Sequence, residues 1–181
     1  DGRSVQFRGE SIPVEAASAD SFDGVDLALF SAGASASRRF APEAVRRGCV
    51  VVDNSSAWRM DAEVPLVVSQ VNPADLAAHR GIVANPNCST MQLTPVLAAL
   101  RDAVGIKRVV VATYQAVSGA GGKALADFAA QREALADGRS VRSSLFPHAV
   151  ALSPLPAIGE FLPDGSTTEE RKLVEESRKI L

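Results

Sequence analysis

The stretch Asn85-Pro86-Asn87-Cys88-Ser89-Thr90 marks the point where a short strand gives way to a helix. An apolar run at residues 81–84 leads into it, and the proline disfavours the α region for the residue before it, so the chain turns there. Asn87 or Ser89 can then cap the helix that follows. Apolar residues recur at helical spacing after this turn and are followed by a glycine that ends the helix: Leu93, Leu97, Leu100, Val104 and Gly105.

Cys88 lies at the start of this predicted helix, among N–H groups that have no partner within the helix. The positive end of the helix dipole lowers the pKa of a thiol and favours the thiolate. The same N–H groups, together with the Asn87 amide, are suited to hold an oxyanion when a carbonyl carbon is attacked. A single cysteine in an apolar region is also commonly an inert small hydrophobe, so these residues alone leave both interpretations open.

Composition excludes several classes of function. The chain has 181 residues, 22% of them charged, and a formal net charge of −2, so nothing indicates a nucleic-acid partner. No apolar run reaches membrane-spanning length. Two cysteines, Cys49 and Cys88, provide no disulfide framework, which favours a reducing, cytoplasmic setting, and no metal site is expected. The length suits one large domain or parts of two.

The first half of the chain has the pattern of a βαβ unit. A buried-type strand at residues 25–30 opens into a loop of small residues at 31–37, and a helix at 38–47 leads to a second buried strand at 49–53. Such a unit within one sheet implies parallel strands joined by a right-handed crossover. Ligands of such sheets bind beyond the carboxyl ends of the strands, where the loop at 54–59 also lies.

Two features of these loops remain open on the residues alone. The small-residue loop lacks a G-x-G-x-x-G pattern, so it is either a tight strand-to-helix turn or a weak phosphate cradle. Arg59 is either a solvated surface arginine or an anion-binding fork. Cys49 opens a strand and is interpreted as a core residue.

The second half of the chain begins with a predicted β-branched strand at 106–113, which ends in a glycine-rich loop at 114–122. The final segment, 167–181, is predicted as a charged helix with a capping box at its start. Glu169 and Lys172 share a face of it, and a solvated face of ion pairs is the usual interpretation. A further helix is expected between these parts, with residues at helical spacing: Leu125, Phe128, Arg132 and Leu135.

Together these pieces resemble one family closely, the aspartate-semialdehyde dehydrogenases. The matching stretches occur in the family's order and span nearly the whole chain: Ser31-Ala32-Gly33, Val52-Asp53-Asn54-Ser55-Ser56-Ala57-Trp58-Arg59, Asn85-Pro86-Asn87-Cys88-Ser89-Thr90, Tyr114-Gln115-Ala116-Val117-Ser118-Gly119, Phe146-Pro147-His148 and residues 169–181. The resemblance implies an α/β fold: the remainder of a Rossmann-like NADP-binding domain at 1–86, then the first part of a catalytic and dimerisation domain at 87–181.

The family reduces aspartyl 4-phosphate with NADPH to aspartate 4-semialdehyde, in the biosynthesis of lysine, methionine and threonine. By resemblance, Cys88 is the nucleophile that displaces phosphate and forms a thioacyl enzyme. Gln115 resembles the residue that orients the acyl group, and Asn87 stands next to the thiol in the same motif. The helix-capped thiol of the residue-based interpretation agrees with this role.

The resemblance also assigns the binding residues. Arg59 and Lys172 resemble the groups that bind the phosphate, and Glu169 resembles the group that holds the substrate amine. The segments expected along the NADP are Ser31, Ala32, Gly33, Ser118 and Gly119. The family implies small-molecule substrates, aspartyl phosphate and phosphate, and a homodimer or homotetramer for the full-length protein.

Departures from the family pattern are equally specific. The family begins with a glycine-rich phosphate loop that would precede Asp1, and its substrate-binding Arg and acid/base His would follow Leu181. Neither His79 nor His148 stands in a matching context, and Gln70 replaces an acidic residue that the family often has there. The chain is therefore expected to be about half of an enzyme.

Two other functions stay open at this point. N-acetyl-glutamyl-phosphate reductase performs the same type of chemistry, although the Asn-Pro-Asn-Cys-Ser-Thr motif and the Gln115 loop favour the aspartyl enzyme. A non-catalytic relative that keeps the fold for assembly or regulation is the other. The presence of Cys88, Arg59, Gln115 and Lys172 argues against a degenerate site.

The first prediction concerns a polypeptide confined to these 181 residues. General acid–base help is worth about 10²–10⁴-fold, and the family's histidine for it lies beyond Leu181. We expect alkylation at Cys88 but no NADP-dependent oxidation of aspartate semialdehyde. NADPH absorbance in the presence of phosphate measures this oxidation, and the full-length enzyme is assayed as the control. Turnover near the full-length rate would return His79 and His148 to consideration as the acid/base.

Overall fold

The computed structural model describes residues 2–181, which form two compact units. The first contains the chain up to Gly105 together with Lys172–Leu181, and the second is Ile106–Arg171. Helix α2 (Cys88–Val104) thus groups with the first unit, whereas the predicted domain division at residue 86, which stays a prediction, places it in the second domain. Among the described residues, no helix is long and apolar enough to cross a membrane.

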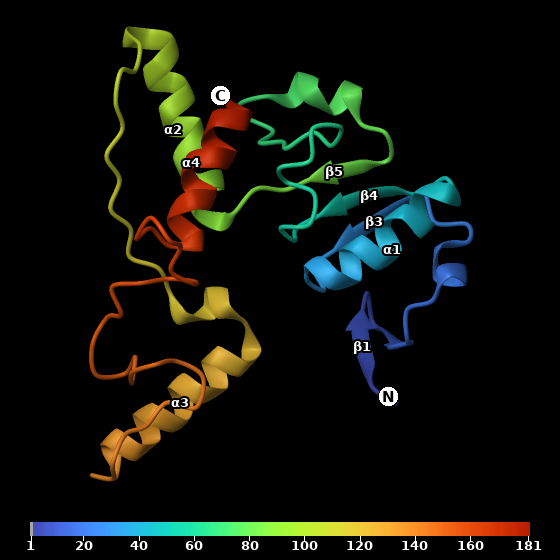
Figure 1. Ribbon diagram of the computed structural model, residues 1–181. Helices are drawn as coiled ribbons and strands as arrows, with labels where there is room; N and C mark the ends of the chain where they lie inside the picture. The colour runs from blue at the N-terminus through green and yellow to red at the C-terminus, as the bar shows by residue number, and fades with distance from the viewer. Residues whose placement is uncertain (1) are drawn as a thin grey trace. The chain divides into compact units, whose positions relative to one another are not determined.

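A three-stranded parallel sheet forms the centre of the first unit (Figure 1). Its order is β3 (Leu27–Phe30), β4 (Val50–Asp53) and β5 (Ile82–Ala84), and α1 (Ala34–Arg46) links β3 to β4. The predicted βαβ unit with parallel strands is therefore confirmed. The remaining short elements of this unit are an antiparallel hairpin and two 3-10 helices: β1 (Ser4–Phe7), β2 (Glu10–Pro13), η1 (Ala19–Phe22) and η2 (Pro73–Ala78).

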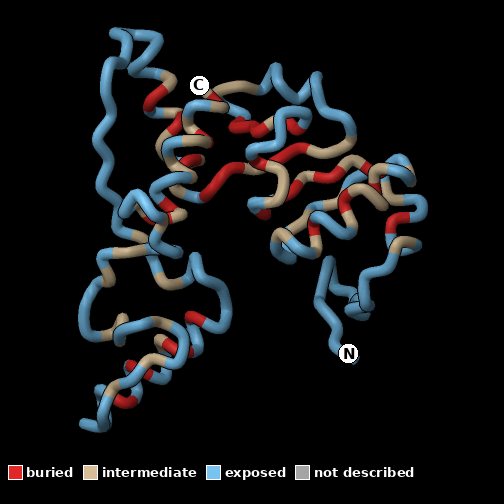
Figure 2. Tube along the Cα trace, in the orientation of Figure 1, coloured by how far each residue is buried: buried red, intermediate tan, exposed pale blue. Residues whose placement is uncertain are grey.

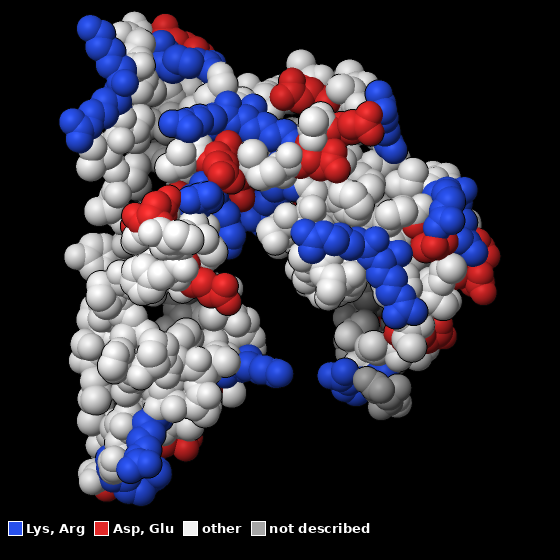
Figure 3. All heavy atoms as spheres, in the orientation of Figure 1, with Lys and Arg blue, Asp and Glu red and all other residues white. Residues whose placement is uncertain are grey.

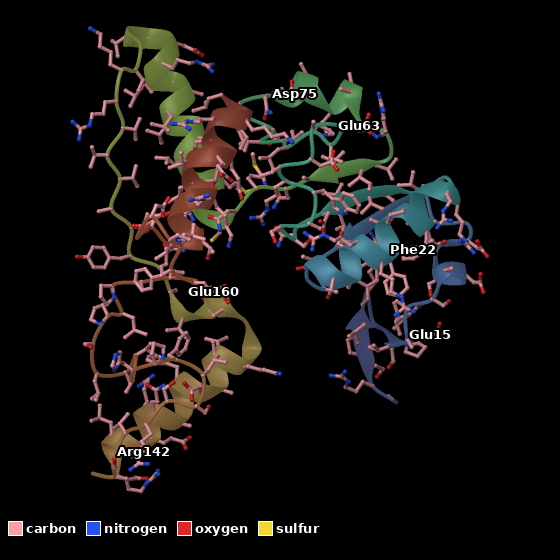
Figure 4. All side chains as sticks on the ribbon, viewed as in Figure 1. Glu15, Phe22, Glu63, Asp75, Arg142 and Glu160 are labelled. Carbon is pink, nitrogen blue, oxygen red and sulfur yellow. The ribbon has the colours of Figure 1, made fainter. Side chains whose placement is uncertain are left out.

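One of the two core clusters of the first unit lies between α1 and one face of the sheet (Figure 2). Phe22 is buried there (Figure 4). Its ring stacks on that of Phe30, with ring centroids 5.7 Å apart. Gly81 allows the close packing, because a Cβ at this position would lie 2.5 Å from a methyl group of Val45. The other members of this cluster are small or β-branched: Ala41, Ala44, Cys49 and Val51. The interpretation of Cys49 as a core residue is confirmed.

Strand β3 is less buried than the sequence predicts. Leu27 and Leu29 are 56% and 78% exposed, whereas Ala28 and Phe30 pack against the core cluster. Alternate residues of a strand point to opposite faces, and β3 is one of the two edge strands of this sheet among the described residues. The apolar run therefore forms a strand of which only one face packs against other described residues.

Helix α2 has the predicted bounds, with Gly105 at its C-terminal cap at a φ of 75°. Its buried residues are Thr90, Thr94 and Leu97, so of the four apolar residues expected on the inner face only Leu97 is buried. Leu100 and Val104 are 48% and 80% exposed. The buried residues of α2 thus lie between Thr90 and Leu97, and its last turn, residues 101–104, is exposed.

The second unit contains the 3-10 helix η3 (Val117–Ala120) and α3 (Gly122–Ala136). The predicted strand at 106–113 is wrong for the described structure, because residues 106–116 form no strand there. Val110 and Tyr114 are 80% and 96% exposed. β-Branched residues favour an extended backbone, but a strand exists only where a neighbouring strand supplies hydrogen bonds.

Helix α3 buries a partly polar face, which differs from the apolar positions noted in the sequence. Its buried residues are Ala124, Asp127, Gln131 and Ala134, while Leu125 and Leu135 are about half exposed. The Asp127 carboxylate accepts from the Ser144 N–H (2.8 Å) and hydroxyl (2.7 Å), from the Ser143 hydroxyl (2.8 Å) and from Gln131 (2.6 Å). Gln131 Oε1 in turn accepts from the Ala151 N–H. Two polar side chains thus hold the segment 143–151 on the helix.

The second prediction concerns this anchor. Hydrogen bonds, first from the Ser144 N–H and then from the hydroxyls of Ser144 and Ser143, lower the pKa of Asp127 to about 2. A carboxyl whose pKa is lowered by folding stabilises the fold above its unfolded pKa of about 3.9. This stabilisation is lost as the pH falls from about 4 through about 2. Asp127→Asn replaces an acceptor by a donor, so we expect faster proteolysis within 143–151 at neutral pH.

Limited proteolysis with peptide mapping measures this effect. Asp137→Asn is the matched control, because Asp137 forms an exposed ion pair with Arg139. Equal cleavage rates for the two variants would contradict the anchoring role of Asp127.

Candidate active site

The carboxyl ends of the three parallel strands carry the polar loops. The Asn54 N–H donates to the Phe30 carbonyl and the Asn85 N–H to the Asp53 carbonyl, each at 2.8 Å. The two asparagine side chains then meet, with Asn85 Nδ2 donating to Asn54 Oδ1 at 2.7 Å. The loops after β3, β4 and β5 therefore gather at one edge of the sheet, as the sequence predicts.

The loop after β4 is held rigidly by buried hydrogen bonds. Asp53 is fully buried, and its carboxylate accepts from the Ser55 N–H at 3.0 Å and from the Ser55 hydroxyl at 2.6 Å. Trp58 Nε1 donates to the buried hydroxyl of Ser37 at 2.8 Å, which ties this loop to α1. Arg59 directly follows Trp58, so its backbone is held in place by these contacts.

Cys88 is the first residue of α2 and is exposed. Asn87 caps the helix, because its Oδ1 accepts from the N–H groups of Ser89 (2.9 Å) and Thr90 (3.4 Å). The predicted cap is confirmed, and Asn87 rather than Ser89 forms it. In this conformation those two N–H groups donate to Asn87, and a role for Asn87 in holding an oxyanion stays a prediction.

Arg59 is buried, which contradicts the alternative of a solvated surface arginine. Each nitrogen of its guanidinium makes one contact: Nε donates to the Asn85 carbonyl (2.9 Å), Nη2 to the Asn54 carbonyl (2.9 Å) and Nη1 to Glu176 Oε1 (3.1 Å). A guanidinium has five N–H groups, so these contacts engage three of them. These contacts fix the plane of the Arg59 guanidinium, and one of them is with the Asn85 carbonyl, two residues before Asn87.

Glu176 is a residue of the candidate site that the sequence-based prediction missed. It lies on α4 (Thr168–Ile180), is 1% exposed, and accepts from the Asn87 N–H through Oε2 at 2.6 Å while Oε1 accepts from Arg59. Lys172 lies one turn before Glu176 on the same face of the helix. Its predicted sharing of an anion with Arg59 stays a prediction. A signal existed in the sequence, namely the helical spacing of Glu169, Lys172 and Glu176.

Helix α4 starts as predicted, but two of its four acidic side chains, Glu169 and Glu176, are buried. The capping box is present: the Thr167 N–H donates to Glu170 Oε2 at 2.5 Å and the Glu170 N–H to Thr167 Oγ1 at 3.2 Å. Glu169 and Glu176 are 8% and 1% exposed, so the predicted solvated face of ion pairs is wrong for these residues. Charged residues on this face serve buried contacts.

In the second unit, Gln115 Nε2 donates to Glu169 Oε1 at 3.0 Å, and the Thr113 hydroxyl donates to Gln115 Oε1 at 3.1 Å. The structure therefore pairs the residue expected to orient the acyl group with the one expected to hold the amine. Ser118 and Gly119 lie in η3 and are exposed. Their contact with a cofactor stays a prediction.

The residues 31–33 precede α1 in the first unit, and all three are exposed. Gly33 is the N-terminal cap residue with a φ of 88°, which an L side chain rarely adopts, and a Cβ there would meet no atom within 4 Å. A helix of 13 residues begins directly after it. Open space, exposed backbone and a helix N-terminus fit an anionic cofactor group, so Ser31, Ala32 and Gly33 remain the predicted contacts.

The histidines and the surface charges point to no other centre. His79 and His148 are exposed, and the Gly81 N–H donates to His79 Nδ1 at 3.1 Å. Residues 2–181 contain no group of three or more His, Cys, Asp or Glu residues placed to hold a metal ion. On the face shown in Figure 3, acidic and basic side chains are intermixed rather than separated by sign.

The third prediction compares the two thiols. Burial raises the pKa of Cys49, with a further contribution from the charge of Asp26, and this thiol is 1% exposed. Cys88 is exposed. Since the thiolate is the reactive form, iodoacetamide should label Cys88 well before Cys49 at neutral pH. Peptide mapping over a time course measures both rates, and equal rates or faster labelling of Cys49 would contradict the assignment.

Two family models match the chain. The semialdehyde dehydrogenase NAD-binding domain matches residues 1–79, and the semialdehyde dehydrogenase dimerisation domain matches residues 97–181. The chain is 50% identical to the aspartate-semialdehyde dehydrogenase of Aquifex aeolicus over 185 residues and 46% identical to that of Bacillus subtilis over 187. These alignments cover 100% and 99% of the chain but 54% of each relative, so the chain spans about half the length of these curated relatives.

Solved structures agree in fold. A crystal structure of aspartate semialdehyde dehydrogenase II from Vibrio cholerae, complexed with ASA, superposes with a TM-score of 0.95 at 41% identity. This superposition covers 99% of the chain and 54% of that structure. The chain therefore belongs to the semialdehyde dehydrogenase family, and its α/β fold with a Rossmann-like parallel sheet is the fold of the aspartate-semialdehyde dehydrogenases.

Proposed function

We propose that the protein is an NADP-dependent aspartate-semialdehyde dehydrogenase that reduces L-aspartyl 4-phosphate to L-aspartate 4-semialdehyde. The observation that carries the proposal is the exposed Cys88 thiol at the start of an asparagine-capped helix, with the buried Arg59 guanidinium bound to the Asn85 carbonyl three residues earlier. A thiol nucleophile beside a fixed cation suits an acyl phosphate, whose leaving group is an anion.

In this reaction the Cys88 thiolate attacks the acyl carbon, the bond from that carbon to the phosphate oxygen breaks, and phosphate leaves with the electron pair. Arg59 and Lys172 bind the phosphate as its charge develops. NADPH, when bound, would supply the hydride for the thioacyl carbon; the contacts proposed for it in the first unit are Ser31, Ala32 and Gly33. Release of the Cys88 sulfur as thiolate then frees the aldehyde.

The pair in the second unit completes the proposed assignment. Glu169 supplies a carboxylate for the substrate amine, and Gln115 orients the acyl group. Their hydrogen bond at 3.0 Å supports this proposal, because it gives each side chain a defined rotamer before substrate arrives. Ser118 and Gly119 are the NADP contacts proposed for the second unit, as residues 31–33 are for the first.

The assembly and compartment follow from the same proposal. The match to a dimerisation domain over residues 97–181 supports a homodimer or homotetramer of the full-length protein. Cys49 and Cys88 are both free thiols, which supports a reducing, cytoplasmic setting. The product would serve the biosynthesis of lysine, methionine and threonine.

The fourth prediction tests the activity in the full-length protein. Cys88→Ser should reduce oxidation of aspartate semialdehyde, with NADP and inorganic phosphate, to background, because a serine hydroxyl is not ionised at neutral pH. Cys49→Ala is the matched control and should keep its rate per folded enzyme. NADPH absorbance measures both, with circular dichroism as the test of folding.

Substrate choice separates the alternatives. A preference for N-acetylglutamate semialdehyde over aspartate semialdehyde would favour the N-acetyl-glutamyl-phosphate reductase alternative. Absence of turnover with either aldehyde in a folded, NADP-binding full-length protein would favour the non-catalytic relative and reject the proposal.

A further inference from the structure

We infer that Glu176 is a positioning residue that couples the phosphate-binding Arg59 to the start of the nucleophile helix. The inference rests on the proposed function, since it assigns Glu176 a part in that same site. One carboxylate reaches both partners: Oε1 lies 3.1 Å from Arg59 Nη1 and Oε2 lies 2.6 Å from the Asn87 nitrogen. Asn87 directly precedes Cys88, so Glu176 fixes the distance between the cation and the thiol-bearing helix.

The chemistry of the two partners requires a carboxylate. Arg59 and the Asn87 N–H are both donors, and a carboxylate presents acceptors at both oxygens. A glutamine of the same length would turn its amide nitrogen toward one of these donors and lose that contact. The ion pair is buried on both sides, with 9% of the Arg59 side chain and 2% of the Glu176 side chain exposed. Charge-assisted hydrogen bonds in such surroundings are the strong and directional ones.

The next turn of α4 holds the backbone of the same arginine. Lys179 Nζ donates to the carbonyls of Arg59 (2.8 Å), Asp61 (2.6 Å) and Val64 (2.9 Å). Burial lowers the pKa of Lys179, with the charge of Asp61 acting in the opposite direction. Glu176 and Lys179 are three residues apart and lie close together on the helix. Helix α4 therefore holds both the side chain of Arg59, through Glu176, and its main-chain carbonyl, through Lys179.

When the charge of Glu176 is removed, a positioning role and simple electrostatics predict opposite changes in phosphate affinity. Removing the Glu176 charge leaves Arg59 uncompensated, which by charge alone would strengthen the binding of a phosphate anion. Loss of position would instead weaken the interaction with phosphate, because misplacing a group in an oriented site can lower the rate on the order of 10²-fold. Weaker phosphate binding in a charge-removing variant can therefore be assigned to lost positioning.

The experiment uses the full-length protein and inorganic phosphate as the probe. Glu176→Gln is compared with Glu175→Gln, a matched change at the neighbouring residue of α4. One readout is the rate of Cys88 alkylation by iodoacetamide as phosphate is added, which needs no turnover. The other is the KM for phosphate and the kcat in NADP-dependent oxidation of aspartate semialdehyde. Arg59→Lys and the double variant Arg59→Lys with Glu176→Gln complete a double-mutant cycle.

We expect Glu176→Gln to raise the phosphate concentration for half-maximal protection of Cys88 by about 10- to 100-fold, and the KM for phosphate in parallel. Glu175→Gln should match the unchanged protein. The double variant should be little worse than Arg59→Lys alone, since Glu176 acts through Arg59. Glu176→Asp keeps a charge but is one methylene shorter, so it should fall between the unchanged protein and Glu176→Gln.

Several outcomes would overturn the inference. These are tighter or unchanged phosphate binding in folded Glu176→Gln, additive effects in the cycle, or no protection of Cys88 by phosphate in the unchanged protein. If neither Glu176→Gln nor Glu176→Asp folds, Glu176 is a stability residue and the inference also fails. Failure of the proposed function looks different: no aldehyde turnover in the unchanged protein, with protection by phosphate still dependent on Glu176.

Discussion

The first unit depends on one buried carboxylate with two donors. Glu176 accepts one hydrogen bond from Arg59 and one from the Asn87 N–H, and these partners precede it in the chain by 117 and 89 residues. Buried ions lose their hydration, and breaking a buried pair by removal of one partner typically destabilises a protein by about 3–5 kcal/mol. The three segments are thus held in one arrangement, since a departure of any one leaves a charge or a donor unsatisfied.

This arrangement uses the edge of the parallel sheet as its base. The strand ends at Phe30, Asp53 and Ala84 place three loops side by side, and backbone hydrogen bonds between neighbouring loops continue the pairing past the strands. Arg59 then donates to the carbonyls of two of these loops, at Asn54 and Asn85. A rigid sheet edge carries the polar groups, so the candidate site inherits its geometry from the core between α1 and the sheet.

The second unit is organised by a different balance of forces. Its helix α3 buries Asp127 and Gln131, whose hydrogen bonds hold the segment 143–151, while Val110 and Tyr114 stay exposed. Polar anchors of this kind specify a single arrangement without a large apolar core. The Gln115–Glu169 pair shows the same principle within this unit, where two polar side chains orient each other.

The sequence by itself determined the local features. A proline, a capping asparagine and a terminal glycine define α2, and apolar runs separated by a small-residue loop define the βαβ unit, because turn chemistry and strand propensity act over a few residues. The resemblance to the family predicted Cys88 and Arg59 as site residues. Features that depend on partners distant in the chain follow from the folded structure and not from local sequence. The folded structure placed Arg59 in a buried network, assigned Glu176 its two contacts, and left residues 106–113 without a strand neighbour and Leu100 and Val104 without cover. Burial and strand pairing each require a partner segment, and a local sequence pattern describes only one of the two partners.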